Sequence, residues 1–335
     1  MTMETWLPLV WYVIIGFAVF MYVLLDGFDL GVGILFPFAP SHEDRDVMMN
    51  SVAPVWDGNE TWLVLGGGGL FIAFPGAYAA AFPALYLPLL LMLIALLFRG
   101  VAFEFRFRAD RSRRFWSAGF FAGSLFAAFA QGLILGNFVA GIPTGDGADA
   151  GAFQWLTPFT LFTALALVIG YALLGATWLI LKTDGPLQAW AYSHVRPLTV
   201  GMLAAIAIVS LWTPLMSDAI AERWFSWPNI LYLSPVPLVT ALLCVWLWRA
   251  ESHHAEEAPF LLTLGLFLLS FVGLAISLWP NILPPDLTIW EAASAPSTQA
   301  FMLVGVVILM PLVLGYTAYS YWVFRGKVRH GVGYH

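Results

Sequence analysis

Apolar runs of about 20 residues recur from one end of the chain to the other, and they restrict its fold more than any other feature. As a helix, one such run is long enough to cross the ~30 Å hydrocarbon core of a bilayer. Charged residues make up only 10% of the 335 residues, whereas about 25% is usual in a soluble domain. The alternation of polar and apolar residues that marks a membrane barrel is absent. The sequence therefore predicts an all-α, polytopic membrane protein whose surface mostly meets the lipid bilayer.

The apolar runs predict nine transmembrane helices, near residues 9–30, 53–74, 78–98, 116–138, 157–181, 198–217, 229–248, 259–279 and 300–324. The first run has no basic segment before it and no small-residue cleavage site, so it is expected to stay as a helix and not to act as a signal peptide. Every Lys and Arg except Arg223 then falls in alternate connections or in the C-terminal tail. Because basic loops stay in the cytoplasm, the N-terminus is expected outside and the C-terminus inside.

Aromatic residues alternate with arginines between 103 and 116, in FEFRFRADRSRRFW. Such a run could be mistaken for a nucleic-acid patch. Since it lies between two predicted spans on the predicted cytoplasmic side, we expect it to bind anionic lipid headgroups and to fix the topology. No nucleic-acid partner is expected.

A short acidic pattern, Asp-Gly-x-Asp/Glu, occurs at the end of the first predicted span and again at the start of the second. The first copy runs from Asp26 to Asp29 and the second from Asp57 to Glu60. On a helix, residues three apart project from nearly the same face. An antiparallel hairpin of the two spans would bring both copies to the cytoplasmic side. Four carboxyl groups are therefore expected to share one region.

Carboxylates inside a membrane span are costly and usually functional. Burial and like-charge neighbours would suit them to proton uptake and transfer. The plainer interpretation is that they lie within the headgroup region as solvated helix ends, which fits Asp29 and Glu60. It fits Asp57 less well, because that residue follows Pro54 and Trp56 directly and precedes an apolar run. We therefore expect a proton role for Asp57 first.

Glycines lie beside both acidic copies. Gly27 and Gly31 form a small-xxx-small pair, and four glycines in a row, Gly66 to Gly69, remove side chains from the second span. Small residues let two membrane helices approach closely. Close helix contacts are therefore expected at both places.

The residues that would hold a redox cofactor are missing from the spans. A haem needs axial ligands, usually histidines, that project inward from helices. None of the six histidines is predicted to lie well inside a span: they are His42, His194, His253 and His254 in loops, and His330 and His335 in the tail. The only cysteine, Cys244, excludes an intrachain disulfide and a Cys-ligated cluster. No catalytic residue, cofactor or metal is expected on this chain.

Two of the stretches described above carry a family resemblance. LLDGFDLGVGILFPF at 24–38 and NSVAPVWDGNETWLV at 50–64 together resemble subunit II of the cytochrome bd-type quinol oxidases. Three further stretches agree: YAAAFPALY at 78–86 with Phe98 and Arg99 after it, GATWLILKTDG at 175–185, and DLTIWEAASAPSTQ at 286–299. The resemblance spans nearly the whole chain. The short loops are also similar to the cyanide-insensitive branch of this family.

The resemblance implies a nine-helix subunit in a bacterial cytoplasmic (inner) membrane, made of two four-helix bundles, at about 9–138 and 157–279, and one peripheral helix at about 300–324. By the same resemblance, its partner is expected to be a haem-bearing subunit I that holds haem b, haem d and the quinol-oxidising loop. The complex is expected to be an electrogenic quinol:dioxygen oxidoreductase that produces water, with this chain not catalytic alone. A small single-helix subunit and a structural quinone are further components that the resemblance allows.

The resemblance also carries residue roles. The family's aspartate in its tryptophan-Asp-Gly-Asn motif matches Asp57, with Trp56, Gly58 and Asn59 around it. This match implies a part for Asp57 in proton delivery from the cytoplasm. Asp26 and Asp29 match the family's first motif, which either lies in the contact with the partner or feeds the same aqueous path. The role of Glu60 stays open.

Two other functions remain consistent with the sequence. A proton-coupled secondary transporter would use intramembrane acids and broken helices, and LGGGGLFIAFPG could be such a break. Against it, the acids gather at one end of the predicted spans and not at the midplane. A structural scaffold, in which the acids serve only assembly, is the third interpretation.

Overall fold

The computed structural model describes residues 2–109, 111–142, 153–329 and 331. Its elements, in chain order, are α1 (Met3–Leu35), the 3-10 turn η1 (Phe36–Phe38), α2 (His42–Val52), α3 (Trp56–Ala73), α4 (Pro75–Ala84), α5 (Tyr86–Arg108), α6 (Arg113–Ala140), α7 (Pro158–Lys182), α8 (Gly185–Met216), α9 (Asp218–Phe225), α10 (Asn229–Leu233), α11 (Pro235–Ser252), α12 (Ala258–Leu278), β1 (Asn281–Leu283), β2 (Leu287–Thr288) and α13 (Pro296–Val323).

The all-α membrane fold expected from the sequence is confirmed. Within the described residues, eight helices are long and apolar enough to cross a membrane, and the bent pair α3–α4 makes a ninth when taken as one broken span. The short strands β1 and β2 form an antiparallel hairpin before α13, with Asn281 opposite Thr288. Most of the predicted loop at 141–153, and the tail histidines His330 and His335, lie outside the described residues.

The chain between 74 and 108 differs from the prediction. We expected one span at 78–98, but residues 75–84 form the separate helix α4, which turns away from α3 by 119°. Pro75 occupies the first turn of α4 and Phe74 leaves the helical conformation, with φ −133° and ψ 63°. Proline cannot donate the backbone hydrogen bond that would continue α3, so the helix breaks there. The third long helix, α5, begins only at Tyr86.

Two predicted loops are in fact helical. Arg99 was placed in a loop, yet α5 continues through it to Arg108. His194 was also placed in a loop, and it lies inside α8, which begins at Gly185. Both segments are polar enough to resemble loops in sequence. In the structure Arg99 forms ion pairs with Asp26 and Glu60, and Nδ1 of His194 lies 2.9 Å from the Trp190 oxygen, so both side chains have partners within the helical fold.

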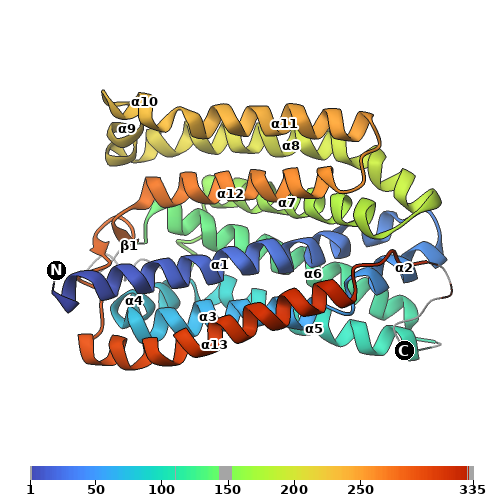
Figure 1. The fold of residues 1–335 in the computed structure, drawn as a ribbon, viewed down its shortest axis with the longest axis horizontal. Coiled ribbons are helices and arrows are strands. Elements are labelled where there is room, and N and C mark those ends of the chain that lie inside the picture. The colour runs from blue at the N-terminus through green and yellow to red at the C-terminus, as the bar shows by residue number, and fades with distance from the viewer. Residues whose placement is uncertain (1, 110, 143–152, 330, 332–335) are drawn as a thin grey trace.

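Helix α1 lies at the centre of the molecule, where it packs against α3, α6 and α7 (Figure 1). Helices α5 and α6 pack together on one side of it, α7 and α12 lie on the other side, and α8 and α11 lie beyond them (Figure 1). Helix α13 contacts α1 and α3, and most of its surface is exposed. The main core forms where the last third of α1 meets α7, with Phe28 stacked on Trp178 at 4.0 Å between ring centroids.

Glycines permit this central contact. A Cβ atom added at Gly31 would lie 1.8 Å from the backbone oxygen of Tyr171, and one at Gly27 would lie 2.8 Å from the Tyr171 ring. In α3, added Cβ atoms at Gly66 and Gly69 would meet α1, whereas Gly67 and Gly68 have no atom within 4 Å. The predicted close contacts are thus confirmed at both places, but only two of the four consecutive glycines make one.

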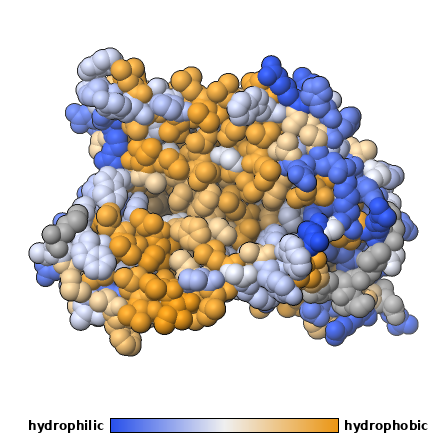
Figure 2. Space-filling model, in the orientation of Figure 1, coloured by the Kyte–Doolittle hydropathy of each residue, from blue (hydrophilic) through white to orange (hydrophobic). Residues whose placement is uncertain are grey.

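The two ends of the bundle differ in polarity. The end that holds α2 and the α5–α6 connection is called the basic end below, and the end with the start of α1, with α9 and with α10 is called the N-terminal end (Figure 1). Apolar side chains cover the middle of the molecule, and hydrophilic ones gather at the basic end (Figure 2). This distribution is that of a protein that spans a bilayer.

Candidate functional site

The acidic hairpin predicted from the sequence is formed by the last part of α1 and the first turns of α3. These two helices pack side by side, and η1 and α2 make the connection between them. Asp26 and Asp29 are both fully buried on α1, at 0% exposure. They lie three residues apart, on the face that the helix turns toward its neighbours.

Arg99 of α5 is the cation at the centre of this site. Its side chain is fully buried, and its Nη1 lies 2.5 Å from Oδ1 of Asp26. Its Nη2 lies 3.3 Å from Oε2 of Glu60, whose side chain is 27% exposed. Trp56 covers the guanidinium, with 5.8 Å from Cζ to the ring centroid. A buried ion pair needs such partners, because an isolated charge would be too costly in this environment.

Asn59 joins three helices beside the ion pair. Its Nδ2 donates to Oδ2 of Asp29 at 2.7 Å, and its Oδ1 accepts from the Tyr321 hydroxyl of α13 at 2.8 Å. Asn59 is 1% exposed, so these hydrogen bonds satisfy an amide that could not otherwise be buried cheaply. The second oxygen of Asp29, Oδ1, has no hydrogen-bond partner in the described structure.

A chain of hydrogen bonds reaches Asp26 from the other direction. The Tyr171 hydroxyl of α7 donates to Oε1 of Gln131 in α6, and Nε2 of Gln131 donates to the Tyr22 hydroxyl of α1, each at 2.7 Å. Tyr22 lies beside Asp26, one turn earlier on the same helix, and interacts with its carboxylate. Every donor in this chain points toward Asp26. Arg99 donates to one oxygen of Asp26, while the second oxygen, Oδ2, has no hydrogen-bond partner in the described structure.

Asp57 does not lie where its neighbours in sequence suggest. The interpretation as a solvated helix end fitted Asp57 less well than Asp29 and Glu60, yet the Asp57 side chain is exposed, while Asp29 is fully buried. The reason is helical geometry: residues two apart project in nearly opposite directions, and α3 turns Asn59 toward α1. Asp57 is close enough to Glu60 for the two charges to interact.

The other motif residues support the site through packing. Trp56 is stacked on Phe103 of α5, with 4.9 Å between ring centroids and 10° between planes. Gly58 faces Tyr316 of α13, and a Cβ atom added there would lie 3.8 Å from its ring. Gly58, Asn59 and Tyr321 line a small cleft of about 20 Å³ between α3 and α13. This volume admits about one water molecule.

Asp46 of α2 forms ion pairs with two arginines at the basic end. Its Oδ1 lies 2.7 Å from Nη2 of Arg106 and 2.6 Å from Nη2 of Arg113. Partial burial raises the pKa of Asp46, but the hydrogen bonds from Arg113 and Arg106 lower it by more, so the pKa lies below its ordinary value. Two arginines that we expected to meet lipid headgroups therefore pair within the protein.

Sequence reasoning found the four acids but missed three of their partners: Arg99, Tyr321 and the Tyr22–Gln131–Tyr171 chain. Arg99 gave a signal, since it is a lone cation directly after an apolar run while the acids in the spans lacked a counter-charge. The tyrosines and Gln131 gave none, because such residues are common in membrane helices for other reasons. Only the folded chain brings them to Asp26 and Asn59.

The described residues do not fit a haem. His194 lies in α8, but its Nδ1 is 2.9 Å from the Trp190 oxygen one turn back on the same helix, so the ring is tied to its own backbone. His42 begins α2, and His253 and His254 follow the end of α11. In the described part of the chain, no three His, Cys, Asp or Glu side chains are grouped to hold a metal ion. The charges of Asp26, Asp29 and Glu60 all interact with Arg99, so this cluster holds more acids than cations.

The comparisons with known proteins agree with this arrangement. Residues 7–324 match the family model of cytochrome bd terminal oxidase subunit II. The chain is 30% identical to cytochrome bd-I ubiquinol oxidase subunit 2 of Escherichia coli (strain K12), over 96% of this chain and 95% of that protein. It is 28% identical to cytochrome bd ubiquinol oxidase subunit 2 of Bacillus subtilis (strain 168), over 96% of each chain.

A solved structure shares the fold. A chain in the structure of bd oxidase from Geobacillus thermodenitrificans superposes with a TM-score of 0.80 at 16% sequence identity, covering 95% of this chain and 98% of that one. The family model covers nearly the whole chain, including both acidic motifs. The chain belongs to the family of cytochrome bd terminal oxidase subunit II.

Proposed function

We propose that this chain is the non-haem subunit II of a bd-type terminal oxidase that oxidises quinol and reduces dioxygen to water. Haem b, haem d and the quinol-oxidising loop belong, in this proposal, to a partner subunit I. The chain stabilises that partner and helps to deliver protons from the cytoplasm. The division into a first bundle at about 9–138, a second at about 157–279 and a ninth helix at about 300–324 is part of the same proposal.

One observation carries the proton role: the four motif acids form a series from the surface to the interior. Asp57 is exposed, Glu60 is partly exposed, and Asp26 and Asp29 are fully buried. Arg99 contacts Asp26 and Glu60 and interacts with the charge of Asp29. Carboxyl groups spaced in this way suit stepwise proton transfer along a membrane protein.

The reaction needs such a supply. Reduction of one dioxygen to two waters consumes four protons. If those protons enter from the cytoplasm while quinol releases its own protons outside, the reaction builds a membrane potential without a pump. In the proposed orientation the N-terminus lies outside and the basic end faces the cytoplasm, as expected from the basic residues gathered there. The acids then lie toward the side from which protons are taken.

The partner's docking face in this proposal is the open side of α3 together with α13. Asp57, Val64 and Phe71 are exposed on α3, and Gly67 and Gly68 have no neighbour within 4 Å. A carboxylate and bare glycines are unusual on a lipid-facing surface, whereas small residues and buried polar groups are typical of helix–helix contacts in membranes. Subunit I would therefore cover Asp57 and continue the proton path.

A small single-helix subunit and a structural quinone remain further components of the proposed complex. No described residue gives an argument for the place of either one. The choice between ubiquinol and menaquinol belongs to the partner chain, which carries the proposed quinol site.

The experiment that tests the function is purification of the chain in mild detergent from a cell that expresses its neighbouring subunits. We expect a second membrane subunit to co-purify with b- and d-type haem absorption bands, and the complex to consume oxygen when quinol is added. The separated chain should be colourless. A chain that is stable alone, without a haem-bearing partner, and that transports a substrate into liposomes would contradict the proposal and support a transporter.

A further inference from the structure

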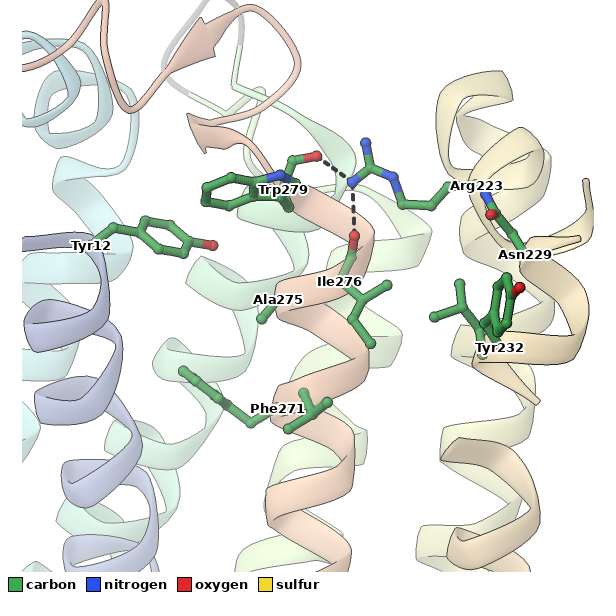
Figure 3. Close-up of a pocket in the computed structure, with 10 residues that line it drawn as sticks. Tyr12, Arg223, Asn229, Tyr232, Phe271, Ala275, Ile276 and Trp279 are labelled. Carbon is green, nitrogen blue, oxygen red and sulfur yellow. Dashed lines mark hydrogen bonds between the residues drawn. The ribbon is translucent and has the colours of Figure 1, made fainter. Parts of the chain in front are cut away.

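An open groove of about 550 Å³, called the cavity below, lies at the N-terminal end of the bundle, far from the acidic cluster. Figure 3 shows that α12 lies between α1 on one side and α9 and α10 on the other. Phe271, Ala275 and Ile276 of α12 contribute to the lining, with Tyr12 of α1 and Tyr232 of α10 on opposite sides. The volume is in the range of small-molecule sites, roughly 300–1,000 Å³.

Arg223 provides the charge of this cavity. Its Nη1 donates to the Ile276 oxygen at 2.7 Å and also to the Trp279 oxygen, at the end of α12. A guanidinium has five N–H donors, and within the described residues its Nε and Nη2 make no hydrogen bond and no carboxylate pairs with it. In Figure 3 the second terminal nitrogen points away from the α12 backbone. The Nε and Nη2 donors of the Arg223 guanidinium are thus available to a hydrogen-bond acceptor from outside the chain.

Arg223 and the apolar part of the cavity, called the slot below, lie at different depths along α12. Trp279, next to Arg223, follows the end of α12, and Phe271 lies eight residues earlier on the same chain. At 1.5 Å per residue the slot therefore extends about 12 Å along α12 from the level of the guanidinium. Tryptophan and arginine at the end of a span mark the headgroup level of the bilayer. The slot accordingly extends from that level into the hydrocarbon.

We infer that this cavity binds a glycerophospholipid, with its phosphate on the Nε and Nη2 donors of Arg223 and one acyl chain along α12. Guanidinium matches phosphate oxygens with two parallel hydrogen bonds. The apolar lining excludes water around the acyl chain, and the bilayer that surrounds the protein supplies the ligand at high local concentration. A quinone also has an apolar tail, but it has no phosphate to use these donors.

The groove lies across α12, and its two sides come from different helices. Arg223 of α9 is hydrogen-bonded to the end of α12, and Tyr12 of α1 packs edge-on against Trp279 at 5.6 Å. An acyl chain along α12 would add dispersion contacts with these side chains. The inference needs a chain that spans a membrane and nothing more.

The test is native mass spectrometry of the purified complex after extensive delipidation, followed by titration with palmitoyl-oleoyl phosphatidylglycerol. Two variants address the two halves of the site. Arg223→Gln removes the charge, and Ala275→Phe fills the slot while leaving the contacts of Arg223 with α12 intact. The matched control is Arg249→Gln, which removes a cation from the last turn of α11, at the other end of the bundle.

The wild-type complex and Arg249→Gln should keep one phospholipid through delipidation and rebind it on titration. Arg223→Gln should weaken the apparent binding constant about tenfold or more, since hydrogen bonds to charged groups are lost, and Ala275→Phe should lose the tightly held lipid. Equal retention in all four proteins would overturn the inference, as would loss in Arg223→Gln alone. Extraction of a quinone in place of phospholipid phosphorus from the wild type would overturn it too.

Discussion

Arg99 is the residue on which the charge balance of the buried acidic cluster depends. It is fully buried and is the only cation that contacts Asp26 and Glu60 among the described residues. Replacement by Gln would leave Asp26 as an unpaired buried charge. We expect Arg99→Gln to lower the free energy of unfolding by about 3–5 kcal/mol, which should appear as a loss of assembled, haem-containing complex and a lower melting temperature in detergent.

A second variant separates the lost charge from lost packing. In Asp26→Asn/Arg99→Gln both members of the ion pair become neutral, so the double variant should be more stable than Arg99→Gln alone. Melting temperatures of the two single variants and the double variant give the coupling between the residues. If the destabilisation of the double variant equals the sum of the two single ones, the pair does not interact as the structure indicates.

The acids and their partners also show how far residue patterns can be interpreted from sequence. The repeated acidic motif predicted Asp26, Asp29 and Glu60 in one place, because three-residue spacing and an antiparallel hairpin follow from helix geometry. The direction of Asp57 could not be predicted, since it depends on which face α3 turns toward α1. Arg99 was missed because a lone arginine after an apolar run resembles the start of a cytoplasmic loop.

At the scale of helices, the contact between α1 and α7 depends on glycine. A methyl group at Gly31 would overlap the backbone oxygen of Tyr171, which lies 1.8 Å from the added atom. Gly31→Ala should therefore separate α1 from α7 and cost about 3 kcal/mol or more, measured as a lower melting temperature of the complex. Gly119→Ala is the control, because an added Cβ there meets no atom within 4 Å. Equal melting temperatures for the two variants would contradict the close contact.

The ion pairs of Asp46 connect α2 with α5 and α6, and we expect their contribution to stability to depend on pH. The pKa of Asp46 is lowered by Arg113 and Arg106 despite partial burial. The stabilisation that the Asp46 ion pairs contribute is therefore fully present above the ordinary aspartate pKa of about 3.9. It is lost as pH falls through the lowered pKa of Asp46 in the folded protein. Asp46→Asn should cost about 2 kcal/mol at pH 7.

The measurement is the difference in melting temperature between the wild type and Asp46→Asn as a function of pH. This difference should stay constant from pH 5 to pH 8 and shrink below about pH 4. A matched control is Glu104→Gln, an exposed acid on α5 that, among the described residues, pairs with Arg108 one turn away. A difference that grows on acidification would have the wrong sign for a carboxylate with a lowered pKa.

The ends of the helices could be predicted from the sequence only where the length of an apolar run defines them. The helices α6, α7, α12 and α13 begin and end within a few residues of the predicted spans, because apolar length alone defines them. The break between α3 and α4 was not predicted, although Pro75 was visible, because a proline in a membrane helix produces a kink or a full break according to its neighbours. The helical continuation of α5 to Arg108 was not predicted, because Asp26 and Asp46, which pair with its arginines, are distant in sequence.

At the scale of the whole molecule, the family comparisons support a terminal oxidase subunit, and nothing in them supports a transporter. The proposed docking face on α3 gives a direct test of assembly. Gly68→Leu places a large side chain where the described chain has no neighbour within 4 Å, so the subunit itself should fold normally. If subunit I packs there, the haem that co-purifies with this chain should fall severalfold.

The control for this variant is Gly119→Leu, at another glycine without neighbours within 4 Å. Haem absorbance per mole of subunit II, with both variants present at equal amounts in the membrane, is the quantity to compare. Full haem content in Gly68→Leu would place the partner on another face of the molecule.

The most direct test of the central claim, that this subunit's acids deliver protons to its partner, is the oxygen consumption of the assembled complex with Asp57→Asn. The complex should keep its haem spectrum, because asparagine has nearly the size and shape of aspartate and Asp57 contributes no packing to the core of this chain. We predict that Asp57→Asn lowers the turnover at least about tenfold. The control Glu104→Gln should keep the turnover of the wild type. Full turnover of Asp57→Asn at normal haem content would contradict the claim and leave the acids with a role in assembly alone.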